Sequence, residues 1–331
     1  MTISFRPLSD ADYDALAELL NEASAAEGHP VAQSGAEFRE EFASFGIDLS
    51  AHTFGAWHGE SLVGVAYVVH VPSETRHEVS YVFGAVSPGF RGRGIGRRLL
   101  GEGLVVAERQ LRATSRPVPK FVRAEAWQTN STAMRLFESA GLRPARYFAD
   151  LRRSLVDVPK PLPIEGVRVV PWDVSRNDEA LEVKNLAFLD HWGSVSMTPD
   201  WWKSHTTGIG SRLDLSFFAV GPDDKIVGYA FSRRFPDDDS LLGGKFAWVD
   251  NVGTLAEWRG RGIATQLITA ALNAYRDAGL EHAAINVDSD NPTGAYRLYE
   301  SLGFSRWRET VVYWREVSRP RASAPPRTSS A

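Results

Sequence analysis

The sequence repeats one plan of elements twice, and this duplication constrains the fold more than any other feature. In each half, a short strand and an amphipathic helix come first, a strand–turn–strand hairpin follows, and a strand, a glycine-rich turn and a helix come next. The offset is constant through the first elements, since 171 − 7 = 164 for Pro171 and Pro7, and 228 − 64 = 164 for Gly228 and Gly64. The corresponding segments are 3–23 and 167–188, 53–69 and 216–232, 79–104 and 246–272, 121–127 and 282–287, and 130–142 and 291–304. This agreement in order predicts two domains of one fold.

A proline-rich segment joins the two predicted domains. The chain has 331 residues, which is more than one hydrophobic core usually serves. Three prolines in 157–166 prevent a helix there and favour a stiff, extended linker. We therefore expect an N-terminal domain over 1–156 and a C-terminal domain over 167–318, followed by a disordered tail over 319–331 that is rich in Pro, Ser and Ala.

Composition excludes several classes of function. The net charge of −4 gives no reason to expect nucleic acid or an anionic membrane as a partner. The chain has no cysteine, which excludes disulfides, thiolate metal sites and a covalent thiol mechanism, and which fits a cytoplasmic protein. The first 20 residues lack the pattern of a secretory signal, and no apolar run in the sequence is long enough to span a bilayer.

A glycine-rich turn between a strand and a helix occurs in each half. It reads RGRGIG at 91–96 and RGRGIA at 259–264. Glycines allow successive backbone N–H groups to point the same way, and the helix N-terminus adds partial positive charge, so such a turn can hold a pyrophosphate. One isolated copy is equally compatible with a plain turn that exposes its arginines. The P-loop pattern and the G-x-G-x-x-G pattern are both absent from the sequence.

Together with the segments that follow them, the two turns resemble those of the GNAT superfamily of acyl-CoA N-acyltransferases. The shared pattern is R-x-x-G-x-[GA] after a strand, then a further strand, then N-x-x-[AG] and L-Y-E-x-x-G-F, and it covers almost the whole chain outside the linker and tail. The resemblance implies an α/β (α+β) fold in which each domain has a mixed, mostly antiparallel central sheet flanked by helices. It also implies acetyl-CoA as co-substrate and no metal. The residues that it assigns to coenzyme A are Val252, Gly253, Thr254, Leu255, Arg259, Gly260, Arg261, Gly262, Ala264 and Asn291 in the second half, and Arg91, Gly92, Arg93, Gly94 and Gly96 in the first.

The two halves differ at the position that GNAT enzymes commonly use as the acid for the departing thiolate. In the helix before the final strand, the second half has Tyr299 and the first has Phe137, which lacks a hydroxyl. A placed acid is worth about 10²–10⁴-fold in rate, so the resemblance implies that Tyr299 is catalytic and that the first half is not. Tyr296, one turn earlier, is the competing candidate, and a core aromatic is the alternative role for Tyr299. The helix entry also differs, because 299 − 291 = 8 residues separate Tyr299 from Asn291, whereas 137 − 130 = 7 separate Phe137 from Asn130.

Asp250 is the candidate base for the proton of the attacking amine, and ordered water is the alternative. It lies on the strand that leads into the second glycine turn, 259 − 250 = 9 residues before Arg259. GNAT enzymes often place a Glu or Asp on this strand, whereas a solvated strand-end carboxylate is the alternative role. The first half has Val82 at the matching offset and Glu78 as the only carboxylate nearby, which again favours the second half as the catalyst.

The segment after the first helix of the second half is expected to wall the acceptor pocket. Residues 185–205 are unusually aromatic and also carry a carboxylate and imidazoles, so a cationic amine would meet both rings and a counter-charge. The candidate residues are Phe188, Asp190, His191, Trp192 and Trp202, with Trp201 and His205 in the same segment. Packing between the domains is the alternative role for Trp201 and Trp202. The corresponding segment of the first half, 21–42, is polar and small.

These features predict that the C-terminal domain transfers an acetyl group from acetyl-CoA to a primary amine of a small molecule, by direct attack in a ternary complex. By resemblance to two-domain family members with an active second half, an amino-sugar thiol precursor or an antibiotic is the leading acceptor class. The N-terminal domain is expected to bind acyl-CoA without turnover or to act as a scaffold. A non-catalytic acyl-CoA sensor and a protein N-acetyltransferase are the alternatives. We expect a monomer or a homodimer with no nucleic-acid or membrane partner.

Overall fold

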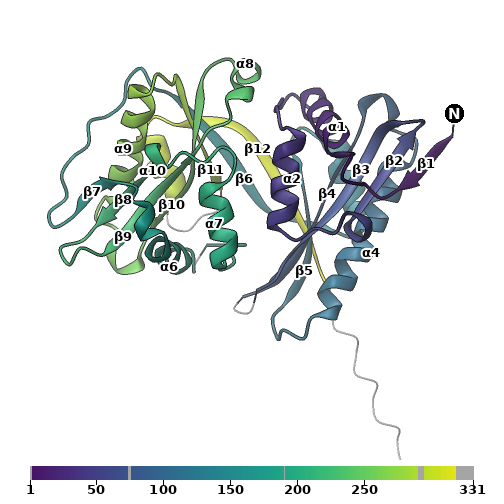
Figure 1. The fold of residues 1–331 in the computed structure, drawn as a ribbon, viewed down its shortest axis with the longest axis horizontal. Coiled ribbons are helices and arrows are strands. Elements are labelled where there is room, and N and C mark those ends of the chain that lie inside the picture. The colour runs from purple at the N-terminus through teal and green to yellow at the C-terminus, as the bar shows by residue number, and fades with distance from the viewer. Residues whose placement is uncertain (1, 74–75, 190, 290–293, 318–331) are drawn as a thin grey trace, which may run out of the picture.

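The chain forms two lobes that share one continuous sheet (Figure 1). The structure is a computed structural model, and it describes residues 2–73, 76–189, 191–289 and 294–317. The sheet has 12 strands in the order β1-β2-β3-β4-β5-β12-β6-β11-β10-β9-β8-β7. The elements of the first half are β1 (Ile3–Arg6), α1 (Tyr13–Ala26), α2 (Gly35–Ser44), α3 (Leu49–His52), β2 (Thr53–His58), β3 (Ser61–Val71), β4 (Glu78–Val86), α4 (Ile95–Ala113), β5 (Lys120–Trp127), α5 (Ser131–Ser139) and β6 (Arg143–Ser154). Those of the second half are β7 (Arg168–Pro171), α6 (Asn177–Ala187), α7 (Pro199–Thr207), β8 (Phe217–Val220), β9 (Ile226–Arg233), α8 (Asp239–Leu242), β10 (Phe246–Thr254), α9 (Ile263–Asp277), β11 (His282–Asp288), α10 (Ala295–Ser301) and β12 (Ser305–Glu316).

The order of elements confirms the predicted duplication and the mixed, mostly antiparallel sheet. Among the described strands, only β4–β5 and β10–β11 pair in parallel. The first of these pairs ends at Tyr81↔Arg123 and the second at Val249↔Ile285. Beyond these points, β4 and β10 continue toward the glycine turns without a partner on that side among the described residues. Each half therefore opens a gap in its sheet next to its glycine turn.

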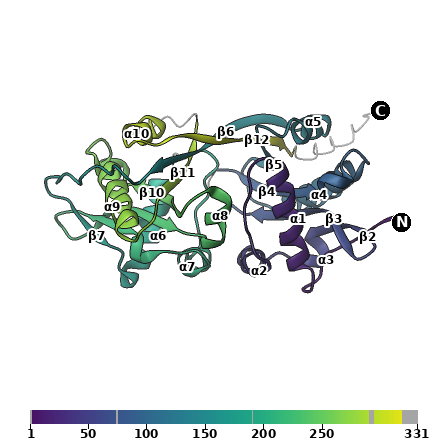
Figure 2. The same cartoon turned by 90° about the horizontal axis from the view of Figure 1, so that it is seen from above.

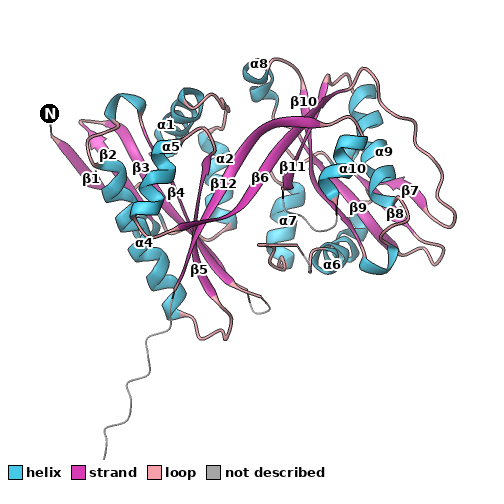
Figure 3. Ribbon diagram, turned by 180° about the vertical axis from the view of Figure 1, so that it is seen from behind, coloured by secondary structure: helices cyan, strands magenta, loops and turns pink. Residues whose placement is uncertain are grey.

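The last strand of each half completes the sheet of the other half, as Figure 3 shows for the two long strands between the lobes. Strand β6 pairs with β11 from Phe148↔Asp288 to Ser154↔His282, and β12 pairs with β5 from Thr310↔Trp127 to Glu316↔Phe121. The two exchanged strands also pair with each other. The sequence predicted a final strand for each half but not its partner, because duplicated sheets offer equivalent edges to both strands. The ranges 1–156 and 167–318 thus divide the chain by repeat, whereas the sheets of the two repeats are interlocked.

Helices cover both faces of the sheet. In the second half, the fully buried side chains of Leu267 and Tyr275 lie on α9, and on the opposite face Trp202 of α7 packs with Phe231 of β9. The first half repeats this arrangement with α4 on one face and α1 and α2 on the other. Figure 2 shows α5 and α10 on the same side of β6 and β12, opposite to α2 and α7. No helix of the described ranges is both long and apolar enough to cross a membrane.

The two halves also touch through the segment around α7. The ring of Trp201 lies 5.6 Å from that of Phe45, which is the interdomain packing considered for this residue. Glu40 of α2 accepts a hydrogen bond from the backbone N–H of Ile209 at 3.0 Å, and Arg76 donates to the carbonyl of His191 at 2.8 Å. The segment expected to wall an acceptor pocket is therefore held partly by the first half.

The segment 157–166 contains no helix, in line with its three prolines. It runs along α9, because Asn273 donates to the carbonyl of Pro159 at 3.0 Å and Gln266 accepts from the N–H of Leu162 at 2.5 Å. The predicted disordered tail, 319–331, lies outside the described residues.

Candidate active site

The two glycine turns have the same backbone shape. Gly92 and Gly94 have φ angles of +77° and +81°, and Gly260 and Gly262 have φ angles of +76° and +81°. Gly94 and Gly262 are the N-cap residues of α4 and α9. No heavy atom lies within 4 Å of the position that a Cβ would take at any of these four glycines. Each turn therefore leaves the start of its helix open to a ligand, and only glycine adopts these angles without strain.

The one difference between the turns has no steric consequence. A Cβ at Gly96, where the second half has Ala264, would lie 3.5 Å from Cδ2 of Leu136 and 3.6 Å from Cγ2 of Val86, which are ordinary contacts. The arginines of the turns also behave alike. Arg93 donates to the carbonyl of Gly89 at 3.0 Å, and Arg261 donates to that of Glu257 at 3.2 Å.

The first arginine of each turn ties the turn to the end of the first helix of its half. Arg91 donates to the carbonyl of Val86 and pairs with Glu27, both at 3.0 Å. Arg259 donates to the carbonyl of Thr254 at 3.3 Å and to that of Ala187 at 2.9 Å. These two side chains therefore brace the turn, in addition to the charge they bring to it.

A cavity of about 510 Å³ occupies the gap in the sheet of the second half, a volume in the range of small-molecule sites. The cavity connects the gap to the glycine turn, since the unpartnered edge of β10 and the start of α9 both line the cavity. Its lining residues include Val249, Asp250, Asn251, Val252, Gly253, Thr254, Arg259, Gly260, Gly262, Ile263, Ala264, Ile285, Asn286, Val287, Asp288, Leu298 and Tyr299. Of the residues assigned to coenzyme A in this half, Leu255 and Arg261 are not part of the lining, and Asn291 lies outside the described residues. The N–H of Leu255 is bonded to the carbonyl of Val227 at 3.0 Å.

Asp250 is the extra residue of a β-bulge. On β10, Val249 pairs with Ser232 and Asn251 with Phe231, so Asp250 has no partner of its own on β9. In the first half, the register between β3 and β4 runs without interruption, and Val82 pairs with Val68. Bulges re-aim side chains next to active sites, and this one directs Asp250 to the cavity wall in the second half alone.

The carboxylate of Asp250 contacts an imidazole on α7. Its Oδ2 lies 3.1 Å from Nε2 of His205. Burial raises the pKa of Asp250, but the adjoining His205 and the charge of Arg233 outweigh it, so the pKa lies below its usual value. Asp250 is therefore an ionised, accepting group at neutral pH.

Tyr299 lines the cavity from α10. Helix α10 ends at a left-handed glycine, Gly303 with φ +83°, and the N–H of Phe304 returns to the carbonyl of Tyr299 at 3.0 Å. Burial raises the pKa of the Tyr299 hydroxyl, so the group stays protonated and can donate. Tyr296 is not part of the lining, and its hydroxyl accepts a hydrogen bond from Arg306 at 3.3 Å. In the first half, Phe137 packs edge-on against the ring of Tyr313.

Three of the predicted acceptor-wall residues line the cavity, namely Phe188, His191 and Trp192. The ring of Trp192 also lies 6.2 Å from that of Phe148 and 5.4 Å from the guanidinium of Arg146. Asp190 lies outside the described residues.

The structure places Trp202 in the core of the second half instead of the cavity wall. Its side chain is 2% exposed, and its indole N–H donates to the carbonyl of Asn177 at 3.0 Å. The role of Trp202 is packing, because this hydrogen bond and the surrounding rings hold α7 against α6 and the sheet.

Sequence reasoning missed the part of the cavity wall that comes from the exchanged strand. Phe148 of β6 lines the cavity, and Arg146 pairs with the buried Asp288 of β11 at 3.1 Å. Asn286 of β11 donates to Asp150 of β6 at 2.7 Å. No local pattern could have identified these residues, since their place depends on which sheet β6 joins.

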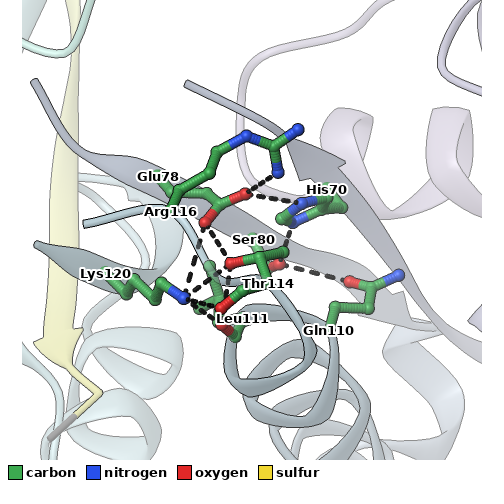
Figure 4. A network of polar contacts seen from close by, with 8 residues as sticks. All are labelled: His70, Glu78, Ser80, Gln110, Leu111, Thr114, Arg116 and Lys120. Atoms are coloured by element: carbon green, nitrogen blue, oxygen red, sulfur yellow. Dashed lines mark hydrogen bonds and ion pairs between the residues drawn. The ribbon is translucent and has the colours of Figure 1, made fainter. Parts of the chain in front are cut away.

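Glu78, the only carboxylate near the corresponding strand of the first half, is buried in a polar network (Figure 4). Its carboxylate lies 2.9 Å from Arg116 and 3.1 Å from His70, and it accepts a hydrogen bond from Thr114 at 2.5 Å. Glu78 starts the parallel pair as Phe246 does in the second half, so it lies four residues before the position of Val82 (82 − 78 = 4). These partners make Glu78 a structural charge and leave the first half without a counterpart of Asp250.

Comparisons with known proteins agree with this geometry. Residues 14–142 and 178–304 each match the acetyltransferase (GNAT) family. The chain is 29% identical over 328 residues to the mycothiol acetyltransferase of Kocuria rhizophila, which covers 95% of this chain and 99% of that one. It is 33% identical over 262 residues to the mycothiol acetyltransferase of Thermobispora bispora, which covers 78% of this chain and 82% of that one.

Solved structures show the same architecture. A GCN5-related N-acetyltransferase from Sphaerobacter thermophilus matches with a TM-score of 0.75 and 25% identity, over 97% of this chain and 98% of that one. A tandem GNAT protein from the clavulanic acid biosynthesis pathway matches in fold, with a TM-score of 0.67 and 17% identity over 96% and 100% of the two chains. With two matched regions that together span most of its length, the chain belongs to the acetyltransferase (GNAT) family, as an acyltransferase-class enzyme built from two GNAT domains.

Proposed function

We propose that the second half transfers an acetyl group from acetyl-CoA to a primary amine of a small molecule, while the first half does no chemistry. The observation that carries this proposal is the meeting of three features in one cavity: the glycine turn, the bulged Asp250 and the hydroxyl-bearing Tyr299. The first half has the turn, but Val82 and Phe137 stand at the other two positions.

The cavity suits the shape and charge of acetyl-CoA. The pyrophosphate would lie on the backbone N–H groups of the turn around Gly260 and Gly262, at the N-terminus of α9. The pantetheine would follow the unpartnered edge of β10 at Val252–Thr254, where backbone amides can also polarise the thioester carbonyl. The turn itself is open to the pyrophosphate, because a Cβ at either Gly260 or Gly262 would meet nothing within 4 Å.

Direct transfer would use Asp250 and Tyr299 for the two proton movements. The neutral amine attacks the thioester carbonyl, a C–N bond forms, and the C–S bond breaks. The proton leaves the amine nitrogen for Asp250 or for an ordered water bound to it, since its carboxylate is ionised. Tyr299 gives its proton to the departing thiolate, and burial keeps that hydroxyl protonated until then.

The acceptor we propose is a small amine of the kind that the relatives' name implies, an amino-sugar thiol precursor related to mycothiol. Two relatives that share 29% and 33% identity with this chain carry that name. The aromatic wall made by Phe188, Trp192 and Phe148 favours a small-molecule acceptor over a protein chain.

Release of the coenzyme A thiol from acetyl-CoA in the presence of a panel of small primary amines tests this proposal. We expect the wild type to respond to at least one amino-sugar amine, and Tyr299→Phe to lower kcat for it by about 10²–10⁴-fold. Tyr296→Phe is the matched control, because it removes a hydroxyl from the same helix away from the cavity, and its rate should equal that of the wild type. If Tyr299→Phe keeps the full rate, the assigned acid is wrong. If the wild type consumes no acetyl-CoA with any amine, the proposed function is wrong and the alternative of an acyl-CoA-binding protein is favoured.

A further inference from the structure

We propose that His205 is a positioning residue for catalysis: it holds the carboxylate of Asp250 against the cavity, where Asp250 accepts the amine proton. This role rests on the proposed function. It concerns a residue of α7 that is not part of the cavity lining and acts on the reaction only through Asp250.

Asp250 faces two ways. It lines the cavity, and its Oδ2 also lies 3.1 Å from Nε2 of His205. Among the described residues, no side chain is bonded to Oδ1, so this oxygen is available to the amine or to a bridging water. A bulged residue lacks the ladder bonds that would fix its direction, and the imidazole supplies that restraint.

His205 is itself fixed. Its ring stacks on that of Trp202 with centroids 5.9 Å apart and lies 4.9 Å from that of Phe231, and both of these side chains are buried. Helix α7 is anchored at its start by Thr198, whose side chain accepts from the N–H of Trp201. The side chain of His205 is 16% exposed and its Nε2 atom is buried, so the imidazole is held in place beside Asp250.

Four other ionisable groups surround the pair. On β9, Arg233 lowers the pKa of Asp250. Tyr229 of β9 and Tyr275 of α9 are buried, and burial together with the charge of Asp250 raises the pKa of each hydroxyl above its usual value, so both stay neutral. Glu41 of α2 lies close enough to Arg233 for the two charges to interact. Of these four groups, Arg233 acts together with His205 to keep the carboxylate of Asp250 ionised.

The first half lacks both members of the pair. The capping residues Ser34 and Thr198 align α2 with α7 at an offset of 198 − 34 = 164, which places Glu41 at the position of His205 (205 − 164 = 41). Val82 stands at the position of Asp250. The pair thus occurs only in the half that has the bulge and the tyrosine.

Two substitutions test whether a donor beside Asp250 is what positions its carboxylate. His205→Gln keeps an N–H donor near the place of Nε2, whereas His205→Ala removes it. The control is Lys203→Ala, an exposed residue of the same helix. With the amine that responds in the panel above, we expect His205→Ala to lower kcat by about 10–10²-fold with little change in KM for acetyl-CoA, and Lys203→Ala to match the wild type.

The comparison of the two variants distinguishes this role from a structural one. His205→Gln should recover most of the kcat that His205→Ala loses, because its amide still offers an N–H donor to Oδ2, while KM for acetyl-CoA stays near the wild-type value in both variants. Wild-type rates in both His205 variants, or an equal loss of kcat in both, would overturn the role of His205 alone. No transfer by the wild type would overturn the proposed function and this role with it.

Discussion

Asp250 and Tyr299 occupy positions where the first half has Val82 and Phe137, so the two repeats differ in the side chains that can move protons. The glycines of the two turns differ much less, since Gly94 and Gly262 share a φ of +81° and open surroundings. The two repeats therefore share the turn and differ in the residues beside the gap. In the function we propose, the turn binds acetyl-CoA and the residues beside the gap determine whether the bound acetyl group reacts.

Asp250→Asn should lower kcat/KM for the amine by about 10²–10⁴-fold, because the amide cannot accept the amine proton. The fold should remain, since Asn has the same size and His205 is the one ion-pair partner of the carboxylate among the described residues. Steady-state kinetics together with circular dichroism of the variant check this expectation. A variant that is folded and as fast as the wild type would assign the base to water alone.

At the scale of elements, the bulge on β10 and the gap between β10 and β11 build the site. The sequence predicted the strand, the turn and the helix, because each has a local pattern of apolar residues and glycines. It could not predict the bulge, since Asp250 differs from Val82 in side chain but not in any local signal for an extra residue. Nor could it predict the contact with His205, which depends on how α7 docks on the sheet.

The start of α1 offers a test of stability against pH. Asp12 accepts two hydrogen bonds from Arg6 and one from the N–H of Ser9, and these bonds, with that of Arg6 the largest cause, lower its pKa to about 2. A pKa lowered in the folded state adds stability above the unfolded value near 4 and loses it as the pH falls toward 2. After allowance for the half-exposed Arg6, the contribution is about 1–2 kcal/mol at pH 7.

Asp12→Asn should therefore lower the free energy of unfolding by about 1–2 kcal/mol at pH 7 and by much less near pH 2.5. Denaturant unfolding of both proteins at the two pH values measures this difference. Asp10→Asn is the control, because Asp10 is exposed and lies 3.7 Å from an exposed Arg39. A loss of equal size at both pH values would show that the ion pair is not its cause.

At the scale of the whole molecule, strand exchange makes the two halves depend on each other. Strand β12 closes the first half's sheet, and β6 supplies Phe148 to the cavity of the second. The duplication, the linker and the order of elements were predictable from the sequence, because each depends on a pattern within consecutive residues. The strand exchange was not predictable, because β6 and β12 follow equivalent elements of the two halves. The sequence contains no signal for the sheet edge that each strand will join.

Because each sheet contains a strand of the other half, we expect the full chain to unfold in one cooperative transition. The reason is that removal of β6 or β12 from its partner sheet exposes the edges of both halves at once. Differential scanning calorimetry should show a single peak. Two separated transitions would mean that the halves are stable without the exchanged strands.

The central claim is that only the second turn serves the reaction, and a matched pair of variants tests it directly. Gly94→Glu and Gly262→Glu place the same charge in backbone of the same φ, +81°, each with no neighbour within 4 Å of the Cβ, so their cost in strain is equal. The measurement is the initial rate of coenzyme A thiol release with the responsive amine. We expect Gly262→Glu to lose at least about 10²-fold in rate and Gly94→Glu to keep the wild-type rate, because a carboxylate at the second turn repels the pyrophosphate. Loss of transfer in Gly94→Glu with retention in Gly262→Glu would contradict this claim.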